Sequence, residues 1–325
     1  MHIQDVFEFI KDDLEGVETF LQKLGTGSRV DLLSEVGSHI LAGGGKRFRA
    51  ALSLLCGRIS GTPPDHRIPL AASIELIHNA TLLHDDIVDR ATLRRGQPAA
   101  YLVWGDPAGV LAANFQFSSA FLTVLKYGGI SALRIVNTSL KALTEGELSQ
   151  FLRIGAVEIN EAEYREIILR KTACLISTAC HIGAIVGTCK EKGPLLARFG
   201  LEVGMGFQMI DDVLDYTSTS ETLGKRVGTD FREGKFTLPL ITALSRVSRE
   251  DREQLLSLLQ APPEIREAHF LWAKELIEKQ NGFDYTRNSA RAHIQGAIQQ
   301  LSDFPYSTER DALETMALYV VERSY

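Results

Sequence analysis

Most segments of the 325-residue chain carry apolar residues at three- and four-residue spacing, which places them on one face of an α-helix. Alternating strand patterns bounded by Asn-Gly or Asp-Gly turns are missing. We therefore expect an all-α protein. Between Glu161 and Ile182 the spacing predicts a helix with an inward stripe formed by Tyr164, Ile168, Lys171, Leu175, Thr178 and Ile182.

Two predicted helices are apolar on nearly all sides, as is typical of helices in the middle of a bundle. We expect one to begin at Pro69 and the other at Pro194, because proline is favoured in the first turn of a helix. Each ends in the pattern Asp-Asp-x-x-Asp, at residues 85–89 and 211–215. No Ser/Gly/Pro-rich linker divides the chain. We therefore expect one domain over residues 1–325, a single helical bundle whose central cavity both acidic ends face.

Composition and charge narrow the class of protein. Apolar residues make up 45% and charged residues 23%, as in soluble globular proteins. The net charge of −6 provides no diffuse positive field, so we expect no nucleic-acid partner. The four cysteines lack CxxC spacing, so we expect neither disulfides nor zinc. We find no secretory leader and no uncharged apolar run of about 20 residues, residues 172–188 being the longest candidate, so we expect a cytoplasmic protein.

The two acidic motifs are candidate metal sites. Asp85 and Asp89 lie one turn apart on one helix face, where like charges repel and burial adds a desolvation cost. Asp211 and Asp215 repeat this arrangement. A solvent-exposed acidic helix end explains one such motif, but two of them behind buried helices favour a cation. Mg²⁺ is the expected ion, because it is commonly held by one or two carboxylates plus substrate phosphates, whereas the interleaved ligands and central glycine of a calcium-binding EF-hand are absent.

Basic residues gather near the first acidic motif in the sequence. Residues 43–45 are glycines followed by a lysine and arginines, a composition that suits anion binding, although the Walker spacing fails and a solvated basic turn is the simpler alternative. His78 shares a helical face with Asp85, although a lone histidine is more often a core residue. The basic candidates are Lys46, Arg47, Arg49, His78, Arg94 and Arg95.

Further candidates occur in the second half of the chain. Lys171 on an inward stripe requires an anionic partner, and Gln208 shares the face of Asp211. Lys225 and Lys235 belong to a long polar segment, residues 216–239, of a length often seen in lids. The sequence contains no Gly-x-Ser-x-Gly elbow or other activated nucleophile. These residues together favour a diphosphate substrate whose departure a metal assists.

The chain resembles the trans-type polyprenyl diphosphate synthases over nearly its whole length. The motifs that carry this resemblance are GGGKRFRA (43–50), LIHNATLLHDDIVD (76–89), LRRG (93–96), EGELSQ (145–150), RKTACL (170–175) and GFQMIDDVLDYTSTSETLGKRVGTDFREGKFTLPL (206–240). The resemblance implies an all-helical isoprenoid-synthase fold, usually homodimeric, that uses magnesium to condense isopentenyl diphosphate with an allylic diphosphate such as farnesyl diphosphate. It also implies at most peripheral membrane contact, for product release.

The resemblance further implies a role for each matching residue. Magnesium at the allylic diphosphate would be held by Asp85, Asp89, Asp211 and Asp215. The allylic diphosphate itself would be held by Arg94, Lys171, Thr172, Gln208, Lys225 and Lys235. Isopentenyl diphosphate would be held by Lys46, Arg49, His78 and Arg95.

Product length is expected to depend on the positions one turn before Asp85, which are Thr81 and Ala80. Members of the family that stop early often have an aromatic residue there, so these small side chains favour a long product. The likeness is strongest to octaprenyl diphosphate synthases, and a shorter farnesyl or geranylgeranyl product is the alternative.

Two other classes share parts of this pattern. Terpene cyclases usually lack a second Asp-Asp-x-x-Asp, and non-catalytic subunits of heteromeric synthases typically have degraded acidic motifs, whereas both motifs are intact here. The chain departs from the family where Ala113-Asn114 replaces Gly-Asp and Ser119 replaces a common arginine. These departures change the surface of the helix that contains residues 113–119, and they bear on product length or on a dimer contact.

Overall fold

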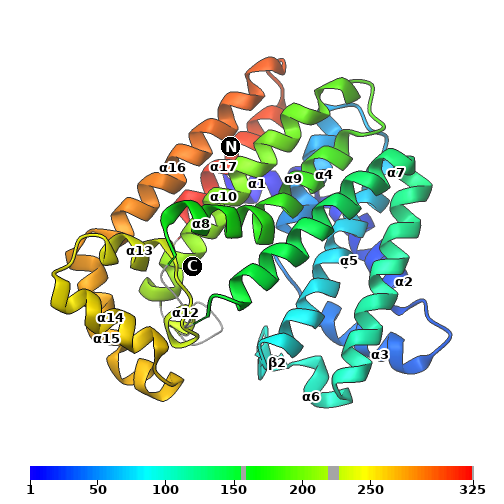
Figure 1. Ribbon diagram of the computed structural model, residues 1–325. Helices are drawn as coiled ribbons and strands as arrows, with labels where there is room; N and C mark the ends of the chain where they lie inside the picture. Colours follow the sequence, from blue (N-terminus) through cyan, green and yellow to red (C-terminus); the bar gives the residue numbers. More distant parts are fainter. Residues whose placement is uncertain (155–158, 219–226, 324–325) are drawn as a thin grey trace. The chain divides into compact units, whose positions relative to one another are not determined.

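The computed structural model describes residues 1–154, 159–218 and 227–323, which are almost entirely helical (Figure 1). The expected all-α class is confirmed. The chain divides into two compact units. Unit 1 comprises residues 1–138, 176–200 and 301–316, and unit 2 comprises residues 139–175, 201–300 and 317–325. A single domain over residues 1–325, with both acidic motifs on one cavity, stays a prediction, because the two motifs belong to different units.

The chain passes between the units within α7 (Asp106–Phe151), α9 (Cys174–Ala184), α10 (Gly193–Thr217) and α17 (Thr308–Glu322). The other elements of unit 1 are α1 (Ile3–Phe9), α2 (Lys11–Thr26), α3 (Asp31–Ala42), α4 (Phe48–Ile59), α5 (Pro64–Val88), β1 (Leu93–Arg94), β2 (Gln97–Pro98), α6 (Ala100–Trp104) and the 3₁₀ turns Lys190–Lys192 and Leu301–Asp303. Those of unit 2 are α8 (Glu161–Ile168), the π-helical turn η1 (Leu169–Ala173), α12 (Thr229–Arg232), α13 (Leu238–Leu244), α14 (Arg249–Gln260), α15 (Pro263–Lys279) and α16 (Gly282–Gln300).

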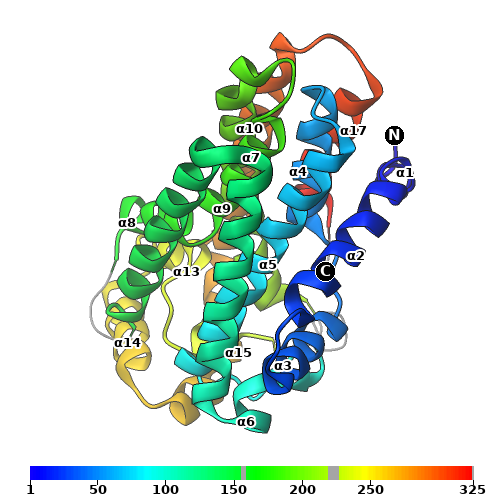
Figure 2. The same cartoon turned by 90° about the vertical axis from the view of Figure 1, so that its right-hand side faces the viewer.

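Helix α5 forms the centre of unit 1. It packs against α2 and α4, and α7 runs beside it, with the His84 and Phe117 rings 5.7 Å apart (Figures 1 and 2). The expected start at Pro69 is wrong, because α5 begins at Pro64 and continues through Pro69. Proline lacks an N–H, so Pro69 removes only one backbone bond near the helix start, and the buried residues that follow offset that loss. The expected start near Pro194 is confirmed by α10.

A short two-stranded hairpin follows the first acidic motif, within the otherwise helical fold. Strands β1 and β2 pair antiparallel, with Leu93 opposite Pro98. Arg95 and Gly96 form the turn with φ angles of 52° and 79°. A tight hairpin turn requires two successive residues with positive φ. At such a φ the backbone of Arg95 is strained, whereas that of Gly96 is not. The hairpin determines where Arg94 and Arg95 lie relative to the end of α5.

The predicted helix over residues 161–182 is confirmed as the continuous run of α8, η1 and α9. The Asn160 side chain accepts the Glu163 N–H at 3.0 Å, and the Glu163 carboxylate accepts the Asn160 N–H at the same distance, so a capping box begins the helix. The apolar stripe is buried as expected. Its middle is π-helical, a rare conformation that is frequent at functional sites, and this turn contains Lys171 and Thr172.

Unit 2 is built around an aromatic cluster at the end of α10. The Tyr216 ring lies 6.0 Å from Phe270 of α15 and 5.8 Å from Phe283 of α16. Gly228 has a φ of 79°, and a Cβ added there would lie 2.2 Å from the Phe270 ring. Glycine is therefore required where the chain approaches this cluster, and the cluster holds the start of α12.

Two helical stretches are long and apolar enough by composition to cross a membrane, α7 and residues 161–184, whose most apolar windows are 44% and 67% buried. The apolar run expected from the sequence, residues 172–188, overlaps the second stretch. The first stretch was not expected, although no charged residue occurs from Pro107 to Leu125. Buried core helices meet the same criterion of length and composition. Parts of α7 are exposed, including Leu111, Leu122 and Leu125.

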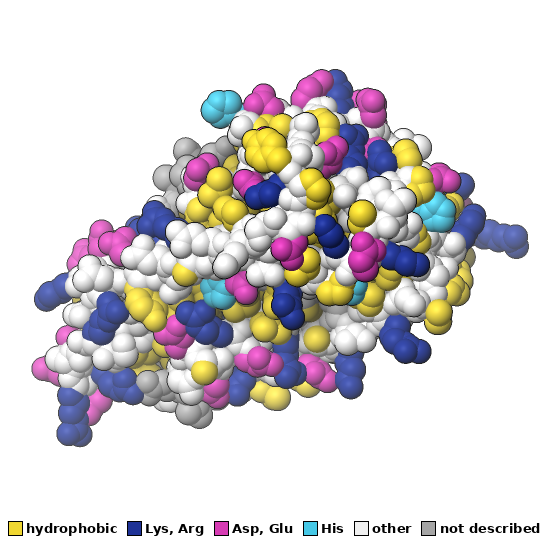
Figure 3. Space-filling model, turned by 90° about the horizontal axis from the view of Figure 1, so that it is seen from above, with side chains coloured by type: hydrophobic (Ala, Val, Ile, Leu, Met, Phe, Trp, Pro, Cys, Tyr) yellow, Lys and Arg dark blue, Asp and Glu magenta, His cyan; other side chains and the backbone are white. Residues whose placement is uncertain are grey.

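Charged side chains of both signs are interspersed over the face shown in Figure 3. Many exposed charges on the described helices form pairs one turn apart, such as Arg249 with Glu253 at 2.8 Å. Pairs of this kind contribute about 0.3–0.5 kcal/mol each. They support local helix formation, whereas the fold depends on the buried apolar faces.

Candidate active site

The first acidic motif occupies the carboxyl end of α5. The Asp89 N–H donates to the Asp85 carbonyl at 2.8 Å, so the two residues are one helical turn apart as predicted. Asp85 is half-buried and Asp89 is exposed. The C-terminal end of a helix carries partial negative charge, which adds to the mutual repulsion of the two carboxylates. A bound cation would relieve this repulsion.

Asp86, between these two residues, has a structural contact. Its carboxylate is buried and accepts hydrogen bonds from Arg94, one of them from Nε at 2.9 Å. Arg94 thereby links the hairpin to α5, and its side chain remains 34% exposed. The predicted diphosphate ligand Arg94 therefore already has a partner, and it lies directly beside the acidic motif.

The predicted arginines of unit 1 gather around His78. Burial lowers the pKa of His78 well below its ordinary value, and the positive charges of Arg49, Arg95, Arg94 and Arg47 lower it further. Burial and neighbouring arginines also lower the pKa of Arg95, whose Nη1 donates to the Gly44 carbonyl. Such a concentration of cations is unfavourable by itself and becomes favourable when an anion binds. A bound anion would therefore stabilise this cluster, in which the imidazole of His78 is held neutral by its lowered pKa.

The lowered pKa of His78 predicts a pH dependence of stability. Between the ordinary pKa of about 6.5 and the lower folded-state value, the unfolded chain binds a proton that the folded chain does not. The free energy of unfolding should therefore fall as the pH drops below about 6.5, by at most about 1.4 kcal/mol per pH unit. His78→Gln should flatten this fall, as measured by thermal unfolding between about pH 5 and 8. The other histidines are common to both proteins, so equal slopes would contradict the burial of a neutral His78.

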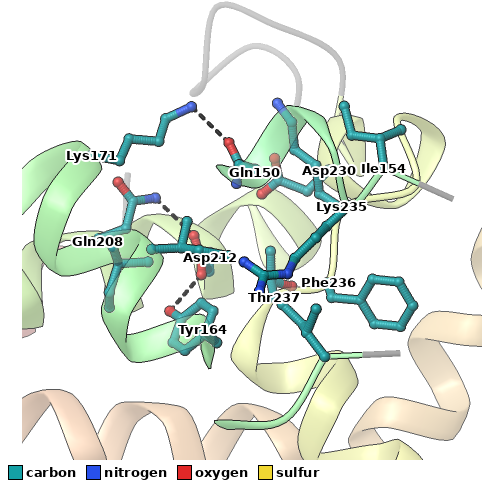
Figure 4. A pocket seen from close by; sticks show the side chains of 14 residues that line it. Gln150, Ile154, Tyr164, Lys171, Gln208, Asp212, Asp230, Lys235, Phe236 and Thr237 are labelled. Atoms are coloured by element: carbon teal, nitrogen blue, oxygen red, sulfur yellow. Dashed lines mark hydrogen bonds between the residues drawn. The ribbon is translucent and has the colours of Figure 1, made fainter. Parts of the chain in front are cut away.

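A cavity of about 70 Å³ in unit 2 holds the residues of the second predicted group (Figure 4). It lies between η1, α10 and the segment that follows α12. Its lining residues are Gln150, Arg153, Ile154, Ile159, Tyr164, Ile167, Ile168, Lys171, Gln208, Asp212, Asp230, Lys235, Phe236 and Thr237.

A chain of hydrogen bonds runs along one wall of this cavity. The Thr172 hydroxyl donates to Gln208 Oε1 at 2.8 Å, and Gln208 Nε2 donates to Asp212 Oδ1 at 2.8 Å. The Tyr164 hydroxyl donates to Asp212 Oδ2 at 2.6 Å. Burial raises the pKa of Asp212 well above its ordinary value and the charge of Asp230 adds to this, while the two hydrogen bonds oppose it. These hydrogen bonds determine that the Gln208 amide oxygen, and not its nitrogen, faces Thr172.

The lysines of this group have different surroundings. Lys171 is three-quarters buried, and its Nζ lies 2.8 Å from both Glu147 Oε2 and Gln150 Oε1, so it has the anionic partner that the sequence required. Lys235 also lines the cavity and pairs with Glu233 at 2.6 Å. Lys225 lies outside the described residues. The two described lysines bring positive charge to the cavity that Asp212 and Asp230 share.

The aspartates of the second acidic motif each contact a different residue. Asp211 Oδ1 pairs with Arg323 at 2.7 Å, and the Asp215 carboxylate, which is buried, accepts the Asp230 N–H at 3.0 Å. Of the motif, only Asp212 lines the cavity, together with Asp230. The predicted ligands Asp211 and Asp215 thus lie at the end of α10 as expected, with contacts that the sequence did not reveal.

The acidic groups can be compared with what a metal ion requires. Within the described residues, no group of three or more His, Cys, Asp or Glu side chains lies close enough to enclose an ion. Mg²⁺ does not need such an enclosure, because it is commonly held by one or two carboxylates with water and substrate phosphates. Asp85 and Asp89, accessible and one turn apart, fit this requirement.

Several residues of these sites were missed as functional candidates by the sequence analysis. Tyr164 was assigned to the apolar stripe, and Asp230 was only part of a quoted motif. Arg323 stands far from every motif, so no sequence signal could have found it. Two signals were available for the others. Tyr164 shares a helical face with Lys171, and Asp230 is an acidic residue within the polar segment 216–239 that also contains Lys225 and Lys235.

Comparison with known proteins agrees with this geometry. The Polyprenyl synthetase family matches residues 30–276. The short chain isoprenyl diphosphate synthase of Methanothermobacter thermautotrophicus is 37% identical over 91% of both chains, and the octaprenyl diphosphate synthase of Escherichia coli is 34% identical over 99% of both.

A solved structure shows the same fold. A polyprenyl synthase from Caulobacter crescentus, complexed with calcium and isoprenyl diphosphate, has a TM-score of 0.92 and 36% identity, covering 99% of this chain and 98% of that one. The likeness extends over the whole length and includes both sites. The chain belongs to the polyprenyl synthetase family and is a prenyltransferase of the trans-polyprenyl diphosphate synthase type.

Proposed function

We propose that the protein uses magnesium to add isopentenyl diphosphate to an allylic diphosphate such as farnesyl diphosphate, making a long, octaprenyl-like, all-trans product. The observation that carries this proposal is the concentration of arginines around a neutral His78 beside an acidic helix end. A gathering of positive charge next to two neighbouring carboxylates suits a substrate that is itself an anion and that a metal bridges to the carboxylates.

In this proposal the basic cluster of unit 1 binds isopentenyl diphosphate. Lys46 is exposed and Arg49 is half-buried, so both can reach a diphosphate, and Arg95 lies beside Gly44. His78 stays neutral at physiological pH, so it can donate one hydrogen bond to a phosphate oxygen without adding charge. The site would thus fix the orientation of the isopentenyl group before the reaction.

The cavity of unit 2 and the acidic ends bind the allylic diphosphate. Lys171, Lys225 and Lys235 would neutralise its charge, with Arg94, Thr172 and Gln208 as further ligands. Asp85, Asp89, Asp211 and Asp215 would hold Mg²⁺, which supplies charge stabilisation to the departing diphosphate. Asp211 would exchange its contact with Arg323 for this role.

The proposed reaction is a condensation at the allylic carbon. The bond between the allylic carbon and its diphosphate oxygen breaks, and the oxygen keeps the electron pair. The double bond of isopentenyl diphosphate then attacks the allylic cation, and a proton is lost, which the released diphosphate can accept. The chain contributes prepositioned cations and a largely buried Lys171, both of which stabilise the departing charge more strongly than water would.

Incubation of the purified protein with magnesium, labelled isopentenyl diphosphate and farnesyl diphosphate, followed by chain-length chromatography, tests this function. Products longer than geranylgeranyl support it, and products that end at farnesyl or geranylgeranyl support the short-chain alternative. If no allylic primer is elongated, the proposal fails and a non-catalytic subunit of a heteromeric synthase becomes the better reading.

Product length should depend on the size of the side chains at positions 80 and 81 of α5. Ala80 is fully buried and Thr81 is 7% exposed, its hydroxyl donating to the His78 carbonyl at 2.8 Å. Ala80→Phe places a ring where a methyl group now lies, so the product should shorten while loss of diphosphate from the allylic substrate continues. Chromatography of the products measures this. Ala80→Val, a smaller enlargement, is the control, and an unchanged product distribution in Ala80→Phe would show that Ala80 does not limit product length.

We also propose a homodimer that contacts through α7. Leu111, Asn114, Ser118, Leu122 and Leu125 are all exposed and follow one face of this helix, which is unusual for so apolar a stripe. The departure at Asn114 falls on this face, whereas Ala113 is buried, so Asn114 bears on the dimer contact. The mass in solution, from sedimentation velocity, tests the dimer. A cytoplasmic location with at most peripheral membrane contact is proposed with it.

A further inference from the structure

Arg47 is more deeply buried than the two basic residues that flank it, Lys46 and Arg49. The side chains of Lys46 and Arg49 are exposed and half-buried, whereas Arg47 is 8% exposed. Its backbone is left-handed, with φ 48° and ψ 36°, although it is not a glycine. A non-glycine residue in this region costs about 1–2 kcal/mol and persists only where surrounding contacts enforce it.

Those contacts come from two other helices. Arg47 Nε lies 2.5 Å from Glu18 Oε1 of α2, and Nη2 lies 3.1 Å from Glu18 Oε2, a two-point contact. Arg47 Nη1 lies 3.8 Å from Glu75 Oε2 of α5. The hydrogen bond to Glu18 and the charge of Glu75 raise the pKa of Arg47, against the opposing effect of burial. The guanidinium therefore joins the turn to α2 and α5.

Glu75 also holds the start of α4. Its Oε1 accepts the Ala50 N–H at 2.9 Å, and Ala50 is the third residue of that helix. The first N–H groups of a helix have no partner within it, and Arg47, which stands at the N-cap position, offers no side-chain acceptor. Buried Glu75 supplies the missing cap from α5, so α4 begins in a defined place next to Arg49.

Arg47 has an electrostatic role as well. Glu75 is close enough to the basic cluster for its charge to oppose the lowering of the Arg95 pKa by burial and by the neighbouring arginines. An unneutralised carboxylate there would repel a bound diphosphate. By pairing with Glu75, Arg47 offsets this charge without pointing at the anion site itself.

We propose that Arg47 is a positioning residue for isopentenyl diphosphate binding. Held by Glu18 and Glu75, it fixes the glycine turn and the start of α4 so that Lys46 and Arg49 present their charges to the diphosphate. It makes no contact with the substrate. This inference rests on the proposed function of the basic cluster.

Kinetics with each substrate varied in turn test the proposal. Arg47→Gln should raise KM for isopentenyl diphosphate by at least about 10-fold, while kcat and KM for farnesyl diphosphate change by less than about 3-fold. Arg47→Lys keeps the charge but loses the two-point contact and should fall between Arg47→Gln and wild type. Glu18→Gln should raise the same KM, and the double variant should be no worse than Arg47→Gln alone. Glu8→Gln, an exposed ion-pair change, is the control.

Calorimetric binding of isopentenyl diphosphate separates this proposal from the proposed function. If wild type binds the ligand but elongates no primer, the function fails, and a weaker affinity of Arg47→Gln still supports the role of Arg47. Equal affinity in wild type and Arg47→Gln overturns it, as does a variant whose kcat and melting temperature fall while the two KM values change to the same extent. Should Arg47→Gln not fold, Glu18→Gln, altered at a half-exposed side chain, decides by the same comparison. A wild type that does not bind overturns both.

Discussion

Asp85→Ala is expected to lower kcat by about 10²–10³-fold at saturating magnesium, the loss typical of removing one preorganised charge-stabilising group. Asp85 is half-buried beside the basic cluster, one turn from Asp89, and both stand at the negative end of α5. Without its carboxylate, Asp89 would be the one remaining metal ligand of the first acidic motif. Initial rates of labelled isopentenyl diphosphate incorporation, measured over a range of magnesium concentrations, give kcat and the metal requirement together.

Asp65→Ala is the matched control, because Asp65 lies on the same helix, is exposed, and stands at its opposite end. It should retain kcat, although loss of a carboxylate near the helix start lowers the free energy of unfolding by about 0.3–1 kcal/mol. A rate for Asp85→Ala close to that of Asp65→Ala would refute the assignment of Asp85 as a metal ligand.

Gly183→Ala is expected to destabilise the protein by about 3 kcal/mol, at the upper end of typical overpacking. Gly183 of α9 packs against α4, where an added Cβ would lie 2.2 Å from the Ser53 carbonyl oxygen. Backbone atoms cannot rotate away as side chains do, so the two helices must separate. Separation would also disturb the hydrogen bond from the Thr62 hydroxyl to the Gly183 carbonyl, now 2.7 Å. Thermal or denaturant unfolding measures the loss.

Gly296→Ala provides the comparison, since it makes the same change within α16. An added Cβ there would meet its nearest atoms, on Glu202, at 3.7 Å, an ordinary contact. The higher helix propensity of alanine should then stabilise the protein by about 0.5–1 kcal/mol. Equal effects of the two substitutions would show that helix propensity, and not the close approach of α4 and α9, governs position 183.

Local patterns predicted the helices well where periodicity and burial agree. The stripe from Tyr164 to Ile182 is buried as expected, because one face of a helix that packs on a core must be apolar. The start of α5 was predicted at the wrong proline, since Pro64 and Pro69 are both compatible with a first turn and only packing decides between them. The hairpin was missed because two-residue strands leave no alternation to detect.

The candidate sites were predicted as residue types more accurately than as contacts. Arg49, His78 and Arg95 do gather, and Lys171 and Gln208 line one cavity. The partners of Arg47 and Asp211 could not be predicted, because Glu18 and Arg323 come from distant parts of the chain. Ion pairs between distant segments follow from how helices pack, and leave no periodic trace in a sequence.

The sequence by itself determined the all-helical class, the two acidic helix ends, the basic turn and the family to which they belong, because periodicity, composition and motif order are local properties of the chain. Only the tertiary structure decided that Arg47 turns inward to Glu18 and Glu75, that Asp212 and not Asp215 lines the cavity, and that η1 is π-helical. Each of these depends on which groups are desolvated together, and the electrostatic energy of a buried charge is set by neighbours that only folding brings near.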